Sequence, residues 1–271
     1  IDYSEPVVVS NKKTTGLAIP LVDYTIQLRS GWNMIGSPFS FPVLAEYDPE
    51  TISGLYLYGE EDRDGWEGPS QVLDPWAGYA IFNDSQTIKS IMLKPFTDSL
   101  ETARMVFTGW ELQLDIDGEK YFDHTGRIGR IEYATEGEDG YDAPKLPLLS
   151  EYLSLAMDIG NKGTFEHSTD FRSLDESNGV WNLRLYGKGE PGPVIVTGSI
   201  LNQVPEDLYI SVVDIPRRAV LDHFLETGLT IQEKITNAYE LKLVAGDENY
   251  VLETVESILA DIPEEFSLGQ T

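Results

Sequence analysis

Apolar and polar residues alternate along short segments of this chain, and turn-forming residues separate the segments. Tyr24–Leu28 alternates with a period of two, and in 105–115 the apolar Trp110, Leu112 and Leu114 interleave with polar residues. A period of two places successive side chains on opposite faces of a strand. Gly, Pro, Asn and Asp mark the turns between the runs. The pattern therefore predicts an all-β chain.

The expected strands cover most of the sequence. They are 6–10, 16–21, 24–28, 32–36, 54–58, 78–82, 87–93, 105–115, 152–157, 180–186, 194–200, 208–213, 229–235 and 238–244. The segment 251–262 fits either a short helix or an extended linker, and no long amphipathic helix, βαβ rhythm or short repeat is expected. Strands at this spacing favour two β-sandwich or jelly-roll-like domains in tandem. A loose polar stretch around Pro95 predicts domains at 1–98 and 99–258, followed by a linker at 259–271.

The charge balance narrows the range of partners. The chain of 271 residues carries 19 basic and 46 acidic residues, a net charge of −27. A surface this negative repels nucleic acid and anionic lipid. No apolar run approaches the roughly 20 residues that span a bilayer. The sequence also has no cysteine, which excludes disulfides and sulfur-based metal sites. We therefore expect neither nucleic-acid binding nor membrane insertion.

Catalytic signatures are missing from the sequence. A hydrolytic triad needs a nucleophile, an imidazole that takes its proton and a carboxylate that orients the imidazole. The three histidines, His124, His167 and His223, lie in no recognisable motif, and there is no Gly-x-Ser-x-Gly or His-Glu-x-x-His. We assign no catalytic residue, and a hydrolase domain stays the last of three functional hypotheses.

Acidic turns are the candidate cation sites. Asp-x-Asp-Gly occurs at 62–65 and 115–118, but neither has the Glu at position twelve that an EF-hand loop requires. The loop at 136–142 holds more carboxylates in a short stretch. The candidate ligands for Ca²⁺ are Asp62, Asp64, Glu136, Glu138, Asp139 and Asp142. The competing interpretation is that these carboxylates only accept backbone hydrogen bonds and hold their loops.

Aromatic residues offer a candidate glycan site. Tyr58 and Trp66 flank a polar hairpin tip, and of the five tryptophans we expect Trp66 to be the most exposed. An exposed aromatic ring can serve as a stacking platform for a sugar. The other tryptophans lie in strand-like contexts, where aromatic side chains usually pack in the core or across strands.

Two stretches of the first hundred residues resemble a known module. Their key residues are Gly31, Trp32, Asn33, Gly36, Pro38, Pro75, Trp76, Gly78 and Tyr79. They resemble the Gly-Trp-Asn-x-Ile-Gly-x-Pro … Pro-Trp-x-Gly-Tyr module found near the C-termini of secreted proteins from Bacteroidetes-like bacteria, often downstream of a protease or other hydrolase domain. We expect these residues to be structural, with Trp32 and Trp76 as paired anchors in the core of the first domain.

Later segments resemble the same architecture. The region 134–147, with the strands at 152–155 and 181–183, is similar to the domain that commonly follows the module. The end of the chain, 262–271, resembles the lead-in to a type IX secretion sorting domain. We therefore expect a mature or excised segment that stops where that sorting domain begins.

Taken together, these features predict a non-catalytic accessory or structural region of a secreted or cell-surface bacterial protein. Its partner would be an upstream catalytic or adhesive domain of the same polypeptide, and its location would be extracellular. The second hypothesis is a module that binds a polysaccharide or another surface polymer. No cofactor is expected, apart from a candidate Ca²⁺ ion.

Overall fold

The structure is a computed structural model that describes residues 8–10, 15–17, 22–59, 63–95, 108–148, 151–190, 192–202, 204–235 and 238–262. Strands dominate these residues, and two α-helices and one short 3₁₀ helix (Ile159–Asn161) accompany them. This confirms the predicted all-β, sandwich-like fold. By its internal contacts the chain divides into two compact units, Ile1–Glu60 with Trp66–Val106, and Glu61–Gly65 with Phe107–Thr271. The predicted boundary at 98/99 lies outside the described residues.

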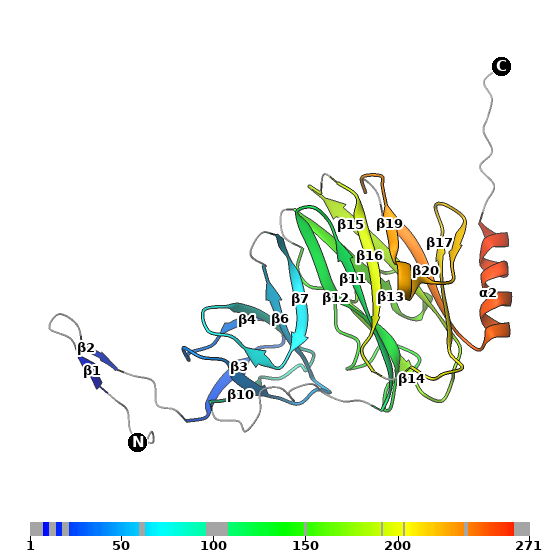
Figure 1. Cartoon of the computed structure of the whole chain (residues 1–271). Coiled ribbons are helices and arrows are strands. Elements are labelled where there is room, and N and C mark those ends of the chain that lie inside the picture. Colours follow the sequence, from blue (N-terminus) through cyan, green and yellow to red (C-terminus); the bar gives the residue numbers. More distant parts are fainter. Residues whose placement is uncertain are drawn as a thin grey trace. The chain divides into compact units, whose positions relative to one another are not determined.

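The first unit contains two antiparallel sheets of four strands and a small hairpin (Figure 1). The hairpin is β1 (Val8–Ser10) with β2 (Thr15–Leu17). One sheet has the order β3 (Tyr24–Leu28), β10 (Lys89–Lys94), β5 (Val43–Glu46), β8 (Val72–Leu73). The other has the order β4 (Gly31–Gly36), β9 (Gly78–Asn83), β6 (Ile52–Tyr58), β7 (Asp64–Ser70). The core of this unit joins Leu28 and Ile91 of the first sheet to Leu55 and Ile81 of the second.

Trp76, in the turn between β8 and β9, is not a core residue. The prediction that Trp32 and Trp76 are paired core anchors was therefore wrong. Trp32 is half-buried and packs on its cross-strand neighbour Phe82, with ring centroids 5.1 Å apart. Trp76 instead is 91% exposed and has a φ of +65°. It follows Pro75 in the turn before β9, and a positive φ directly after such a proline is the geometry of a type II turn. The turn therefore presents the indole to solvent.

Other residues of the module hold the turns of the first unit. Asn33 accepts a hydrogen bond from the backbone N–H of Arg29 at 3.0 Å and donates to the carbonyls of Arg29 and Gly31 at 2.8 Å each. These bonds close the β3–β4 turn, in which Gly31 has a φ of +85°. Tyr79 is buried, and its hydroxyl accepts the N–H of Asp74 at 2.9 Å.

The second unit is a larger sandwich (Figure 1). One sheet has the order β19 (Leu229–Ile231), β16 (Val194–Ile200), β11 (Gly109–Asp117), β12 (Tyr121–Ile131), and β14 (Thr169–Ser173) pairs in parallel with the end of β12. The facing sheet has the order β13 (Tyr152–Asp158), β15 (Gly179–Lys188), β20 (Tyr239–Gly246), β17 (Tyr209–Asp214), β18 (Ala219–Leu221). Between the sheets, Trp110 meets Trp181 edge to face at 5.6 Å within the main apolar core.

Two helices complete the second unit, the short α1 (Phe224–Thr227) and the longer α2 (Glu248–Asp261). The side chain of Asp247 caps α2 by accepting the N–H of Tyr250 at 3.0 Å. Val251 and Val255 pack against Val213 and Val244 on the outer face of β17 and β20. Of the two alternatives for 251–262, the short helix is therefore confirmed, and it extends up to Asp261. No helix among the described residues is long and apolar enough to cross a membrane.

Candidate functional site

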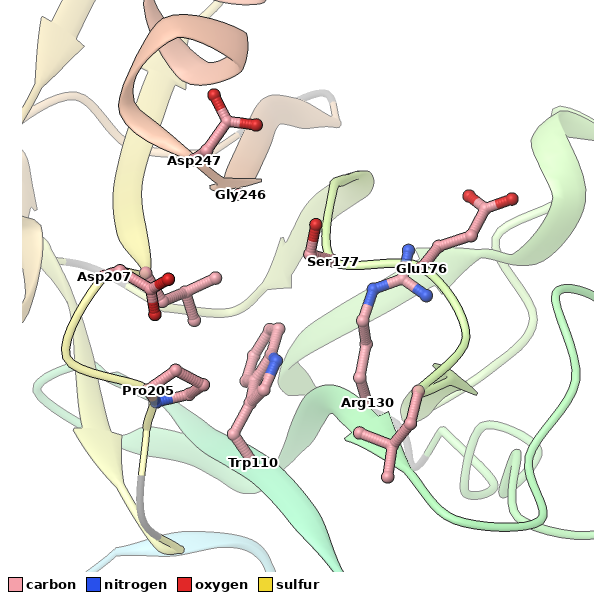
Figure 2. A pocket seen from close by; sticks show the side chains of 10 residues that line it. Trp110, Arg130, Glu176, Ser177, Pro205, Asp207, Gly246 and Asp247 are labelled. Carbon is pink, nitrogen blue, oxygen red and sulfur yellow. The ribbon is translucent and has the colours of Figure 1, made fainter.

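A pocket of about 190 Å³ opens at one end of the second unit (Figure 2). The start of β11, the end of β12 and the junction of β20 with α2 meet there with two loops, 174–177 and 205–208. Antiparallel pairing brings these segments together although they are distant in the sequence. The pocket lies wholly within the second unit, so its geometry depends on one packed core.

Trp110 and Arg130 form the base of the pocket as directly opposed residues of β11 and β12. They are 3% and 1% exposed. The indole N–H of Trp110 has no hydrogen-bond partner among the described residues, and it is not one of the polar groups that the protein encloses completely. Figure 2 shows the indole nitrogen on the side of the ring that faces Arg130. The base thus offers a free donor to the pocket.

Arg130 is a buried cation that pairs with Glu136 and donates hydrogen bonds to two backbone carbonyls. Its Nη1 donates to Glu136 at 2.6 Å and to the carbonyl of Ser173 at 2.5 Å, and its Nη2 donates to the carbonyl of Asn178 at 2.5 Å. Its guanidinium also lies 5.8 Å from the ring of Trp181. A buried charge is stable only when it is paired and hydrogen-bonded. These contacts hold Arg130 in place and tie the loop after β14 to β12.

The rim of the pocket is acidic. Glu176 and Asp207 are exposed, and neither forms a hydrogen bond or ion pair with another described residue. Asp247 also lines the rim, but it caps α2 and accepts a bond from Asn178 at 3.3 Å. The hydrogen bond from the backbone of Tyr250 is the main reason why the pKa of Asp247 is lowered. Two of the three rim carboxylates are therefore free to accept hydrogen bonds.

A glycine lets the rim close around Asn178. A Cβ on Gly246 would lie 2.2 Å from Oδ1 of Asn178, so no other residue fits without a shift. That Oδ1 accepts the backbone N–H of Asp247 at 3.0 Å. The contact links the loop before β15 to the start of α2 and thereby fixes one wall of the pocket.

The acidic loop predicted as a cation site holds itself together instead. Glu136 pairs with Arg130, and Glu138 pairs with Lys162 at 3.1 Å and His167 at 3.4 Å. Asp139 accepts hydrogen bonds from the backbone N–H groups of Thr135 and Tyr141, and Asp142 accepts them from Asp139 and Phe171. Of the other two candidates, Asp64 is exposed at the start of β7, and Asp62 lies outside the described residues. No group of three potential metal ligands converges within the described part of the chain.

Asp142 should make the stability of the second unit depend on pH. Burial raises its pKa to about 8, the charges of Asp139 and Asp170 add to this, and two backbone N–H groups oppose it. A carboxyl with a raised pKa binds its proton more tightly in the folded state than in the unfolded state. Its contribution to the stability of the folded state is therefore complete below the unfolded pKa of about 4 and is lost as the pH rises towards 8. We expect the free energy of unfolding, measured with urea, to fall across this range by up to about 1.4 kcal/mol per pH unit.

Asp142→Asn should flatten this slope. It should not abolish it, because His124 titrates in the same direction. Burial opposes protonation of His124, but its hydrogen bond to Asp117 at 3.1 Å and the nearby carboxylates outweigh burial and raise its pKa. A slope between pH 5 and pH 8 that is identical in the Asp142→Asn variant would contradict the assignment to Asp142.

The histidines do not form a hydrolytic site with the residues that the structure describes. His124 contacts Asp117, and His167 contacts Glu138, but neither imidazole is hydrogen-bonded to a hydroxyl group. Nδ1 of His167 is buried without a partner. His223 is exposed next to α1. The geometry that would support the hydrolase hypothesis is therefore not found among the described residues.

The aromatic pair at the hairpin tip also differs from the expectation. Tyr58 and Trp66 are cross-strand partners on β6 and β7, with ring centroids 4.9 Å apart in an edge-to-face arrangement. Trp66 is only 9% exposed, so the prediction that it is the most exposed tryptophan was wrong; Trp76 is. Flanking a polar tip does not expose a side chain when its own strand face is covered.

The pocket itself was missed by sequence reasoning. Trp110 was expected to be buried, which is confirmed, but nothing in the sequence connects it with Arg130, Glu176 or Asp207. No family model, curated protein or solved structure matches the chain.

Proposed function

We propose that this chain is a non-catalytic accessory region of a secreted or cell-surface multidomain protein. The observation that carries the proposal is that the charged groups inside the second unit are bound to structural partners. Arg130 binds two backbone carbonyls and Glu136, and Asp123 binds Lys145 and three donors of β12 and β13. Side chains held in this way orient loops and sheets, and they are not available to move protons for a substrate.

The resemblance of 28–39 and 73–82 to the secreted Gly-Trp-Asn module supports the extracellular location and an upstream domain as partner. In that role the two units space or stabilise the catalytic or adhesive part of the same polypeptide. The large negative charge, −27, favours solubility of such an exposed region.

The purified chain should show no turnover of ester, peptide or glycoside substrates. Turnover above background that His167→Ala or His124→Ala abolishes would contradict the proposal, because those imidazoles would then act on substrate. Asp64→Asn serves as a control, since this exposed carboxylate at the start of β7 contacts neither imidazole.

A second candidate function is binding of a polysaccharide or another surface polymer. The pocket of the second unit favours it, because a buried tryptophan at its base retains a free N–H donor beneath free carboxylates. A pull-down on insoluble glycans should retain the chain. Absence of retention on every glycan tested would count against this function and would leave the accessory role intact.

A further inference from the structure

The pocket beside Trp110 has opposite polarity at its base and at its rim. At the base are the indole N–H of Trp110 and, beside it, the side chain of Arg130 (Figure 2). At the rim are the carboxylates of Glu176 and Asp207, which have no partner among the described residues. A ligand that satisfies both ends must accept a hydrogen bond at the base and donate hydrogen bonds at the rim.

We infer that this pocket binds one neutral sugar ring, the terminal residue of a glycan, through Trp110, Glu176 and Asp207. The inference rests on glycan binding, the second of the two proposed functions. A sugar hydroxyl both accepts and donates, so neighbouring hydroxyls of one ring can meet the indole N–H and the carboxylates together. Hydrogen bonds to ionised carboxylates are also stronger than those between neutral groups.

Charged ligands fit the pocket less well. An ammonium group has donors only, so it can pair with the rim carboxylates but leaves the N–H of Trp110 without an acceptor. A carboxylate or phosphate meets three acidic side chains, because Asp247 also lines the rim. The polarity of the site therefore selects an uncharged polyhydroxylated molecule.

The size and walls of the pocket restrict the ligand further. Pockets for drug-sized ligands measure roughly 300–1,000 Å³, so a pocket of about 190 Å³ takes a single ring. Leu174, Pro205 and Leu208 supply apolar walls against which the C–H face of a ring can pack. Figure 2 shows Pro205 and Asp207 on the side of the pocket opposite Arg130 and Glu176. This arrangement encloses one residue and leaves the remainder of a glycan outside.

Heteronuclear NMR of chain labelled with ¹⁵N at tryptophan tests the inference. Addition of glucose, galactose or mannose should shift the indole N–H resonance of Trp110 selectively, with a dissociation constant on the order of 1 mM for at least one sugar. Glucuronate should bind at least about tenfold more weakly than glucose, because its carboxylate meets the acidic rim. Glu176→Gln and Asp207→Asn should each weaken binding about tenfold. Glu256→Gln, an exposed position on α2 away from the pocket, removes the same charge and should have no effect.

Any one of the following outcomes would overturn the inference. One is that no neutral sugar shifts the Trp110 resonance. Another is that the uronate binds as tightly as the neutral sugar. A third is that Glu176→Gln and Asp207→Asn weaken binding no more than Glu256→Gln does. The chain could also be retained on an insoluble glycan in a way that free monosaccharides do not compete with and that Asp207→Asn does not reduce. Polymer binding would then lie outside this pocket. That result would sink the pocket assignment while leaving glycan binding as a function.

Discussion

Trp181→Ala should lower the free energy of unfolding of the second unit by about 3–5 kcal/mol. Trp181 is fully buried between the two sheets, where it packs edge to face on Trp110. The guanidinium of Arg172 lies 4.5 Å from its ring, and its Nε1 donates to the carbonyl of Asp170 at 3.1 Å. Truncation creates a cavity, leaves a carbonyl without its donor and removes a cation–π contact from Arg172. Urea or thermal unfolding of the variant measures the loss.

Trp76→Gly is the matched control for this prediction. Trp76 is 91% exposed and adopts a φ of +65°, a conformation that costs a residue other than glycine about 1–2 kcal/mol. Removing this side chain should therefore leave the stability unchanged or raise it. Trp181→Phe keeps a ring but loses the N–H, and it should fall between the two. Equal effects of Trp181→Ala and Trp76→Gly would show that the core has been misassigned.

Lys145→Met should cost about 3–5 kcal/mol, because it leaves a buried carboxylate without its counter-ion. The carboxylate of Asp123 is 2% exposed, and the ammonium of Lys145 contacts it at 2.5 Å and the carbonyl of Leu155 at 2.6 Å. Asp123 also accepts the N–H and O–H of Thr125 and the N–H of Leu155. The pair therefore connects β12, β13 and the segment that carries Lys145, and unfolding with denaturant at neutral pH should report its loss.

Lys162→Met provides the comparison for Lys145→Met. Lys162 pairs with Glu138 at 3.1 Å, but both side chains are more than half exposed. Exposed ion pairs are worth at most about 1 kcal/mol, so this change should have a small effect. Similar losses for the two variants would mean that Asp123 does not depend on Lys145.

The longest strand shows why part of the fold escaped prediction. β12 (Tyr121–Ile131) was not expected, because Gly126, Gly129 and several polar residues interrupt its apolar pattern. The structure explains the glycines. A Cβ on Gly129 would lie 2.2 Å from the carbonyl oxygen of Trp110, and one on Gly126 would lie 2.7 Å from that of Leu114. Close approach of β11, and not flexibility, requires glycine at these positions.

The acidic residues were beyond prediction for a related reason. Acidic side chains are so frequent in this sequence that their spacing carries little information. Which of them binds a backbone N–H, as Asp139 and Asp142 do, and which stays free, as Asp207 does, depends on contacts with distant segments. The pocket is the clearest case, because its base and its rim come from separate segments of the chain.

Local alternation of apolar and polar residues was enough to determine that this chain is built of strands, and the predicted segments 24–28 and 194–200 coincide with β3 and β16. The reason is that strand formation and the choice of its buried face depend on neighbours two residues away. The tertiary structure alone decided which tryptophan is exposed, which charges are paired and where a pocket opens. Those properties arise from long-range packing, which brings Trp110 and Arg130 together with Asp207 at one end of the sandwich.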